Sequence, residues 1–288
     1  MEVIVVTIEK LSNGFEYILV QNSSAVAKIA LQGAHLFHYC KTNEEPLLWL
    51  SDISYYEQGK AIRGGIPICW PWFGFHKDKT LPQHGFARTS IWKFVSSDEP
   101  DAKTSSVIFR LTHSDETLKM WNHKFDLELK ITINDSLKLE LKTTNLDEGE
   151  FTITQALHTY FAVSDISEVS ISGLNKKPYL DALTLKQEIQ DGDIFFNSEV
   201  DRVYQKVDGE VILRDKNREI TIMNSCSSSV VVWNPWIEKT KRMSAMREDA
   251  YRNMLCIESS NAYDDAVVVK PNSSHTLEAV ILSLRKSS

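Results

Sequence analysis

The sequence has few cysteines and no long apolar run. Its four cysteines form no CxxC pair and lie among apolar or aromatic neighbours, which favours free buried thiols in a reducing cytosol over a disulfide or a metal site. No apolar run approaches the roughly 20 residues of a membrane helix. The N-terminal MEVIVVTIEK has no basic region before its apolar residues, so it indicates a first strand rather than a signal peptide. We therefore expect a cytoplasmic protein without membrane contact. The cysteines are Cys40, Cys69, Cys226 and Cys256.

An excess of positive charge is also missing. The formal net charge is −7 at pH 7, with a pI of about 5.7, which argues against nucleic-acid binding through a basic surface. An anionic substrate stays possible, because charges beyond about 8 Å are largely screened and local arginines decide such binding. The 288 residues, 42% of them hydrophobic and 25% charged, are typical of a globular protein with a sizeable core.

Helical periodicity is scarce, and alternation of apolar and polar residues dominates. FDLELKITIND at Phe125–Asp135 alternates, and LKLELKTT resumes the pattern after Ser136, which predicts a β-hairpin with one buried face. Short helical turns are expected near Glu238–Met246 or Ala250–Met254. Many short strands between turn signals indicate an all-β sandwich. Further strands are expected at Val107–Thr112, Glu168–Ile171, Val211–Leu213, Ile220–Met223, Ser229–Trp233 and His275–Leu284, and surface loops at Ser96–Ser106 and Asn261–Asp265.

The segment from Arg63 to Arg88, RGGIPICWPWFGFHKDKTLPQHGFAR, is dense in glycine, proline and aromatic residues. Glycine and proline break both helices and central strands, so the segment predicts a large irregular loop, stiffened by proline and packed by tryptophan. Loops held on a rigid scaffold often carry binding sites. The arginine at each end could clamp a phosphate or a carboxylate.

The same loop carries a family resemblance. RGGIPICWPWFG and LPQHGFAR resemble the signature segments of the hexose-6-phosphate mutarotases, also called glucose-6-phosphate 1-epimerases, within the aldose 1-epimerase superfamily. ALHTYF, EVDRVY, WNPWIEK and NMLCIES follow in that family's order through most of the chain. The resemblance implies one domain, residues 1–288, with the galactose-mutarotase-like super-sandwich of large antiparallel sheets.

Two residues could carry acid–base chemistry. His158 lies in ALHTYF among aromatic residues, where a histidine taken alone is more often structural. Glu258 follows the apolar run of NMLCIES, and its plain interpretation is a surface glutamate at a strand end. The resemblance places the catalytic acid at His158 and the catalytic base at Glu258. A histidine pKa near 6.5, and a carboxyl whose pKa partial burial raises, suit these roles.

The resemblance also implies a substrate site. Arg63, Gln83, Arg88 and Asp201 match the substrate-binding positions of the family, and His84 matches a position that contacts the sugar. Taken alone, each arginine is an ordinary solvated charge, and Asp201 could instead pair with its neighbour Arg202 or shape a turn. Two arginines fit the dianionic phosphate of a hexose 6-phosphate better than they fit a neutral sugar.

The implied reaction opens and recloses a cyclic hexose by proton transfer, so no cofactor and no metal are expected. A zinc site at His76, His84 and Asp78 is an alternative without a compact ligand spacing to support it. The competing functions are an aldose 1-epimerase for unphosphorylated sugars and a sugar-phosphate-binding module without catalysis. A monomer is expected, with a hexose 6-phosphate as its partner.

Overall fold

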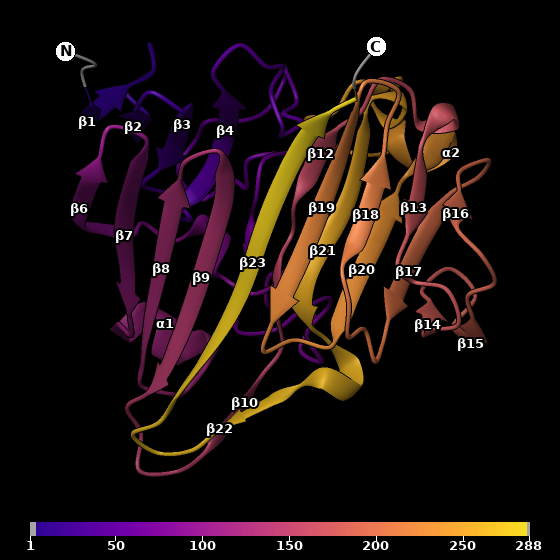
Figure 1. The fold of residues 1–288 in the computed structure, drawn as a ribbon. Helices are drawn as coiled ribbons and strands as arrows, with labels where there is room; N and C mark the ends of the chain where they lie inside the picture. Colours follow the sequence, from indigo (N-terminus) through magenta and orange to yellow (C-terminus); the bar gives the residue numbers. More distant parts are fainter. Residues whose placement is uncertain (1–3, 287–288) are drawn as a thin grey trace.

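The computed structural model describes residues 4–286, and most of them belong to antiparallel sheets (Figure 1). The largest sheet has nine strands. In order across this sheet, the strands are β16 (Ile194–Phe195), β13 (Ser170–Ser172), β18 (Val211–Arg214), β19 (Arg218–Ser225), β23 (Ser274–Arg285), β9 (Ser136–Asn145), β8 (Phe125–Ile133), β7 (Thr104–Thr112) and β6 (Lys93–Asp101).

An eight-stranded sheet packs behind the first one in the view of Figure 1. Its central strand pairs with neighbours on both sides and also with a short extra strand. In order, the strands are β15 (Lys186–Ile189), β14 (Pro178–Asp181), β17 (Val200–Tyr204), β20 (Ser229–Asn234), β21 (Met254–Asn261), β11 (Gln155–Leu157) and β5 (Ile68–Cys69), and the extra strand on β21 is β12 (Tyr160–Ala162).

Smaller elements complete the fold. None of the helices in residues 4–286 is long and apolar enough to cross a membrane. A four-stranded sheet contains β1 (Val5–Lys10), β2 (Glu16–Gln21), β3 (Ala25–Ala30) and β4 (His35–Lys41), and a two-stranded sheet contains β10 (Phe151–Ile153) and β22 (Val267–Val269). The short helices are α1 (Asp115–Met120), α2 (Trp236–Thr240) and the 3-10 turns η1 (Ala87–Thr89), η2 (Ile166–Glu168), η3 (Ala250–Arg252) and η4 (Tyr263–Asp265).

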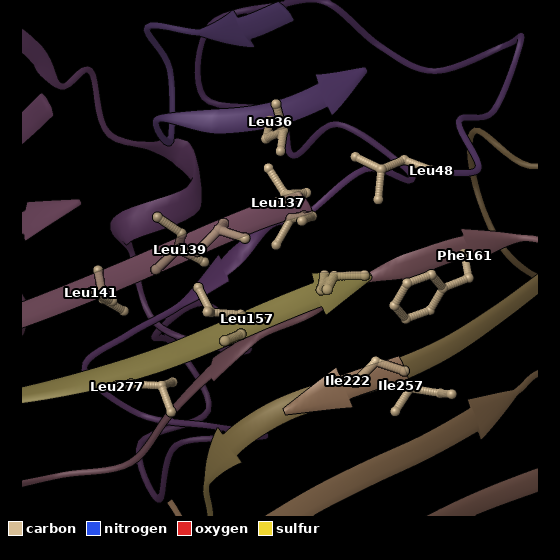
Figure 2. Close-up of a cluster of buried hydrophobic side chains, with 14 of the residues drawn as sticks. Leu36, Leu48, Leu137, Leu139, Leu141, Leu157, Phe161, Ile222, Ile257 and Leu277 are labelled. Carbon is tan, nitrogen blue, oxygen red and sulfur yellow. The ribbon is translucent and has the colours of Figure 1, made fainter. Parts of the chain in front are cut away.

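The main core lies between the two large sheets. Strand β8 alternates buried and half-buried residues from end to end, as a strand with one face in a core does. Figure 2 shows leucines of β9 and β23 in one cluster with apolar residues of the opposite sheet. Full burial of each such side chain contributes roughly 1.5–3 kcal/mol. The labelled residues include Leu137, Leu139, Leu141, Leu157, Phe161, Ile257 and Leu277.

The predicted all-β sandwich is confirmed, and so is the hairpin at its centre. Strands β8 and β9 pair from Phe125↔Asn145 to Ile133↔Leu137. The loop predicted at Ser96–Ser106 is wrong, because β6 and β7 form a hairpin there. Strand β6 is an edge strand with almost every side chain exposed, so it lacks the alternation that reveals a strand.

The strand predicted at Glu168–Ile171 is only partly correct. Glu168 ends the 3-10 turn η2, and strand β13 begins at Ser170. The predicted loop at Asn261–Asp265 is likewise partial, because Asn261 still belongs to β21 and the 3-10 turn η4 follows it. Boundaries of this kind depend on turn geometry, which leaves little trace in a hydrophobic pattern.

Strand β21 is buried along its whole length and serves two different surfaces. Leu255 and Ile257 join the main core between the sheets. Met254 and Cys256 belong to a second cluster on the opposite face, together with Tyr160 and Trp233. Side chains alternate between the faces of a strand, so Glu258 shares this second face with Cys256. That outer face of the eight-stranded sheet carries the candidate site.

Candidate active site

His158 and Glu258, which lie 100 positions apart in the sequence, meet on this outer face. His158 occupies the short break between β11 and β12, and both of these strands pair with β21. Its backbone N–H donates a hydrogen bond to the Pro67 carbonyl at 3.0 Å, which fixes the break against the long loop. Nε2 of His158 then lies 3.2 Å from Oε1 of Glu258. The strand pairing therefore builds a histidine–carboxyl contact.

Glu258 does not follow the apolar strand, as the sequence suggests, but sits inside it. Its side chain is almost fully buried, with the residue 1% exposed. Burial raises the pKa of the Glu258 carboxyl well above its ordinary value, and the negative charge of Asp201 raises it further, whereas Arg88 opposes the shift. Within residues 4–286, Oε2 of Glu258 has no hydrogen-bond partner. A buried carboxyl oxygen left in this way is available to a ligand.

His158 is held between aromatic rings. It stacks on Tyr160 with ring centroids 4.8 Å apart at 11°, and the ring of Trp233 meets it edge-on at 5.9 Å. Burial lowers the pKa of His158 well below its ordinary value, and the positive charges nearby, including Arg88 and Arg63, lower it further. Opposite shifts in the two partners favour an uncharged pair, with its one shared proton between them.

The segment Arg63–Arg88 is confirmed as irregular, with only the two-residue strand β5 and the start of η1 inside it. Gly85 has φ +72°, and a Cβ there would lie 1.9 Å from the carbonyl oxygen of Trp70. Only glycine fits such an approach. The neighbouring His84 also adopts a left-handed backbone, φ +64°, and its Nδ1 accepts the Gly74 N–H at 3.2 Å. Backbone contacts thus hold this loop in one shape.

His84 lies beside the acid–base pair. Its ring centroid is 5.8 Å from that of His158, in an edge-to-face arrangement. Burial lowers the pKa of His84 to about 3, and Arg88 and Arg63 contribute to the shift. His84 is therefore a neutral imidazole at neutral pH, suited to hydrogen bonding rather than to carrying charge.

The two arginines are held by different contacts. Arg63 Nη1 lies 3.4 Å from the hydroxyl of Tyr160, and its Nε is buried without a partner among the described residues. Arg88 Nη2 donates to the backbone carbonyl of Gln83 at 2.7 Å. The side chain of Gln83 itself is exposed. The positive charges of both guanidiniums lower the pKa of His158.

Asp201 belongs to the same face through β17. It pairs in register with Trp233 of β20, which pairs in turn with Cys256 of β21. The expected alternative of a salt bridge between Asp201 and Arg202 is not formed, because Arg202 lies over the ring of Tyr179. Asp201 instead faces Lys239 of α2, with Nζ 3.6 Å from Oδ2.

Several contributors to this face were not singled out from the sequence. Tyr160 supports His158 by stacking, and Trp49 stacks on Tyr160 at 5.9 Å. Lys239 lies over Trp233. The HTYF and WNPWIEK segments drew attention to these neighbourhoods, but only the folded arrangement shows which members of each segment make contact.

The histidines of the zinc alternative are engaged locally. Nδ1 of His76 accepts the Asp78 N–H at 3.0 Å, and the Asp78 carboxylate accepts from Thr80. In the described part of the chain, no three or more His, Cys, Asp or Glu side chains gather as a metal site would require. The four cysteines are unpaired in the structure, but only Cys69 and Cys256 are buried, whereas Cys40 is half-buried and Cys226 is exposed, which corrects the expectation that all four are buried.

A separate cavity of about 490 Å³ is lined in part by Trp49. Its wall includes Phe37, Leu48, Arg218 and Arg285, and it contains none of the seven candidate residues. The Arg218 guanidinium in this wall donates a hydrogen bond to the backbone carbonyl of Pro46 at 3.0 Å, which is a structural contact between two chain segments. We therefore base the candidate site on the converging side chains around His158 and Glu258.

Comparisons with known proteins agree on one family. The model of the family described as aldose 1-epimerase matches residues 16–282. A protein named "Putative glucose-6-phosphate 1-epimerase" from Escherichia coli (strain K12) is 36% identical over 274 residues, covering 94% of this chain and 91% of that protein. One of the same name from Cenchrus ciliaris is 37% identical over 276 residues, covering 91% and 83%.

Solved structures give the same result. The crystal structure of a "putative mutarotase (YeaD)" from Salmonella typhimurium superimposes with a TM-score of 0.92 at 33% identity, over 98% of this chain and 94% of that chain. The galactose 1-epimerase from Lactobacillus acidophilus NCFM has a TM-score of 0.75 over both full chains at 12% identity, and it supports the fold alone. The chain belongs to the aldose 1-epimerase family.

Proposed function

We propose that this isomerase interconverts the α and β anomers of a hexose 6-phosphate, and that glucose 6-phosphate is the substrate to test first. The observation that carries the proposal is the 3.2 Å contact between His158 and Glu258, together with the positive charges of Arg63 and Arg88, both of which lower the pKa of His158. The curated relatives named for glucose 6-phosphate support the same choice.

The proposed reaction moves two protons and breaks one bond. Glu258 takes the proton of the C1 hydroxyl while His158 gives a proton to the ring oxygen. The bond between C1 and the ring oxygen breaks, its electron pair stays on that oxygen, and C1 becomes the aldehyde carbon. After rotation about C1–C2, the two residues exchange roles, and the ring closes on the other face of the aldehyde.

The substrate phosphate would also set the protonation of the pair. Both guanidiniums lower the pKa of His158. A dianion bound beside Arg63 and Arg88 offsets these positive charges and so raises the pKa of His158 toward its ordinary value. A protonated His158 is the form that can protonate the ring oxygen.

The other residues have roles that follow from their positions. Asp201 faces the sugar from the β17 side and accepts hydrogen bonds from its hydroxyls, while His84 and Gln83 border it from the long loop. A non-catalytic binding module would not need the buried acid–base pair of His158 and Glu258. An epimerase for unphosphorylated sugars would not need two arginines beside it.

The test is exchange between the anomers at C1, measured by NMR magnetisation transfer with glucose 6-phosphate and with glucose. We expect the enzyme to accelerate exchange for the phosphorylated sugar far more than for glucose. Equal acceleration of both sugars would favour the unphosphorylated substrate class, and binding of glucose 6-phosphate without any acceleration would favour the binding module.

A further inference from the structure

Lys239 contacts residues of the candidate site, although it is not among the site residues expected from the sequence. It lies in α2, which begins directly after Pro235, and the Asn234 side chain accepts the Trp236 N–H at 2.9 Å. From α2, the Lys239 side chain reaches Asp201 of β17 and the ring of Trp233 of β20. The Lys239 ammonium therefore reaches the outer face that carries His158 and Glu258.

One ammonium serves two carboxylates there. Nζ of Lys239 lies 3.2 Å from Oε1 of Glu199 and 3.6 Å from Oδ2 of Asp201. It also lies over the ring of Trp233, 5.9 Å from the centroid. Trp233 is the ring that meets His158 edge-on. Lys239 thus contacts Asp201, the carboxylate proposed to bind the sugar, and also lies over Trp233, the ring that packs against His158.

The surroundings of Asp201 make this cation necessary. Burial raises the pKa of Asp201, and the carboxylates of Glu199 and Asp181 raise it too, while Lys239 opposes all three. The other titratable neighbours of Asp201 are Tyr263, Cys256 and Glu258, and burial together with the negative charge of Asp201 raises the pKa of each of them. In the described chain Lys239 is the cation in contact with Asp201. Without it, Asp201 would face Glu199 uncompensated.

We infer that Lys239 is a positioning residue, which holds the Asp201 carboxylate ionised and aimed at the sugar so that the two side chains act as one unit. This inference rests on the proposed function, because that function supplies the sugar that Asp201 would bind. An isolated ion pair at a surface contributes little, but here three charged groups form a network over a buried ring. The negative charge of Asp201 also acts on Glu258, so the unit reaches the base.

The variants follow from this pairing. Lys239→Met removes the charge and keeps the length, and Lys239→Arg keeps the charge. Lys241→Met is the matched control, because Lys241 is exposed just after α2 and, among the residues that the structure describes, its ion pair is with Glu238, at 2.9 Å. Asp201→Asn supplies the partner variant for a double-mutant cycle.

Two readouts test the unit. The KM and kcat for glucose 6-phosphate should give at least a tenfold loss of kcat/KM in Lys239→Met, chiefly through KM, with recovery in Lys239→Arg. The double variant with Asp201→Asn should match Asp201→Asn alone within about twofold. Carbon-13 NMR of the Asp201 carboxyl should show that its pKa is higher by about one unit or more in Lys239→Met than in the wild-type protein.

The inference would be overturned if the loss of kcat/KM in the double variant equalled the product of the two single losses. It would also be overturned if Lys239→Met behaved like Lys241→Met. The carbon-13 titration needs no turnover. If the wild-type protein failed to act on hexose phosphates, an unshifted Asp201 titration would still refute the pairing, and a shifted one would support it while the proposed function fell.

Discussion

Replacing Glu258 with glutamine tests the acid–base pair most directly. The change keeps the shape of the side chain and leaves an amide that can donate to Nε2 of His158 across the 3.2 Å contact. The amide cannot take a proton. Since the buried carboxyl has one oxygen without a partner, the neutral amide should not destabilise the fold.

The expected loss can be worked from the contact. General acid–base catalysis by one positioned group typically contributes 10²–10⁴-fold, or about 2.7–5.5 kcal/mol at 1.36 kcal/mol per tenfold change. Because His158 and Glu258 touch, they should act as one unit. Glu258→Gln, His158→Gln and the double variant should therefore be slowed to a similar degree, rather than the double variant suffering the product of both losses.

The assay is NMR exchange at saturating glucose 6-phosphate, with the spontaneous rate subtracted and folding checked by circular dichroism and thermal unfolding. Near-normal exchange in Glu258→Gln would remove this residue from the base role. A double variant slowed by the product of the single losses would show that the two residues act separately, which would refute the shared-proton pair.

Three further predictions concern the loop and the buried histidine. Arg88→Ala should raise the KM for glucose 6-phosphate roughly 10- to 150-fold, the equivalent of about 1.5–3 kcal/mol for a charged hydrogen bond, while the control Arg110→Ala, at a β7 residue that pairs with Asp126 of β8, leaves KM unchanged; an unchanged KM in Arg88→Ala would rule out phosphate binding by this residue. Gly85→Ala should lower the free energy of unfolding, measured in urea, by about 2–5 kcal/mol, because its Cβ would overlap the Trp70 carbonyl at φ +72°; full stability would contradict the loop geometry. Burial lowers the pKa of His35 to about 4, so below pH 6.5 the unfolded chain binds a proton that the folded one does not, and His35 alone should remove about 2 kcal/mol of stability between pH 6.5 and 5; because the pKa values of His84 and His158 are lowered too, His35→Gln should reduce the slope by that amount without abolishing it, and an equal slope in both proteins would exclude a contribution from His35.

Local patterns predicted the parts of this protein that depend on local chemistry. Alternation over Phe125–Asp135 predicted the central hairpin, and the glycines and prolines of Arg63–Arg88 predicted an irregular loop. The hexose-6-phosphate mutarotase resemblance selected His158 and Glu258 from among many polar residues. The contact between them, however, depends on the pairing of β11 and β12 with β21, which no single segment encodes.

Lys239 shows why the remainder could not be predicted. On the sequence it is one lysine in a charged segment, and nothing distinguishes it from Lys241. Its role depends on the turn after Pro235 and on the register that puts Asp201 opposite Trp233. Long-range register of this kind is set by the packing of whole sheets, so it appears only in the folded chain.

The outer face of β21 shows how stability and chemistry are divided in this fold. Leu255 and Ile257 pack the core from one side of the strand, while Glu258 on the other side keeps a buried oxygen without a partner. Nδ1 of His158 and Nε of Arg63 are also unpartnered among the described residues. Each such atom costs about 1–3 kcal/mol, which the large core can offset. Sugar hydroxyls and a phosphate are the groups that would complete these bonds, so binding should recover part of that cost where the reaction takes place.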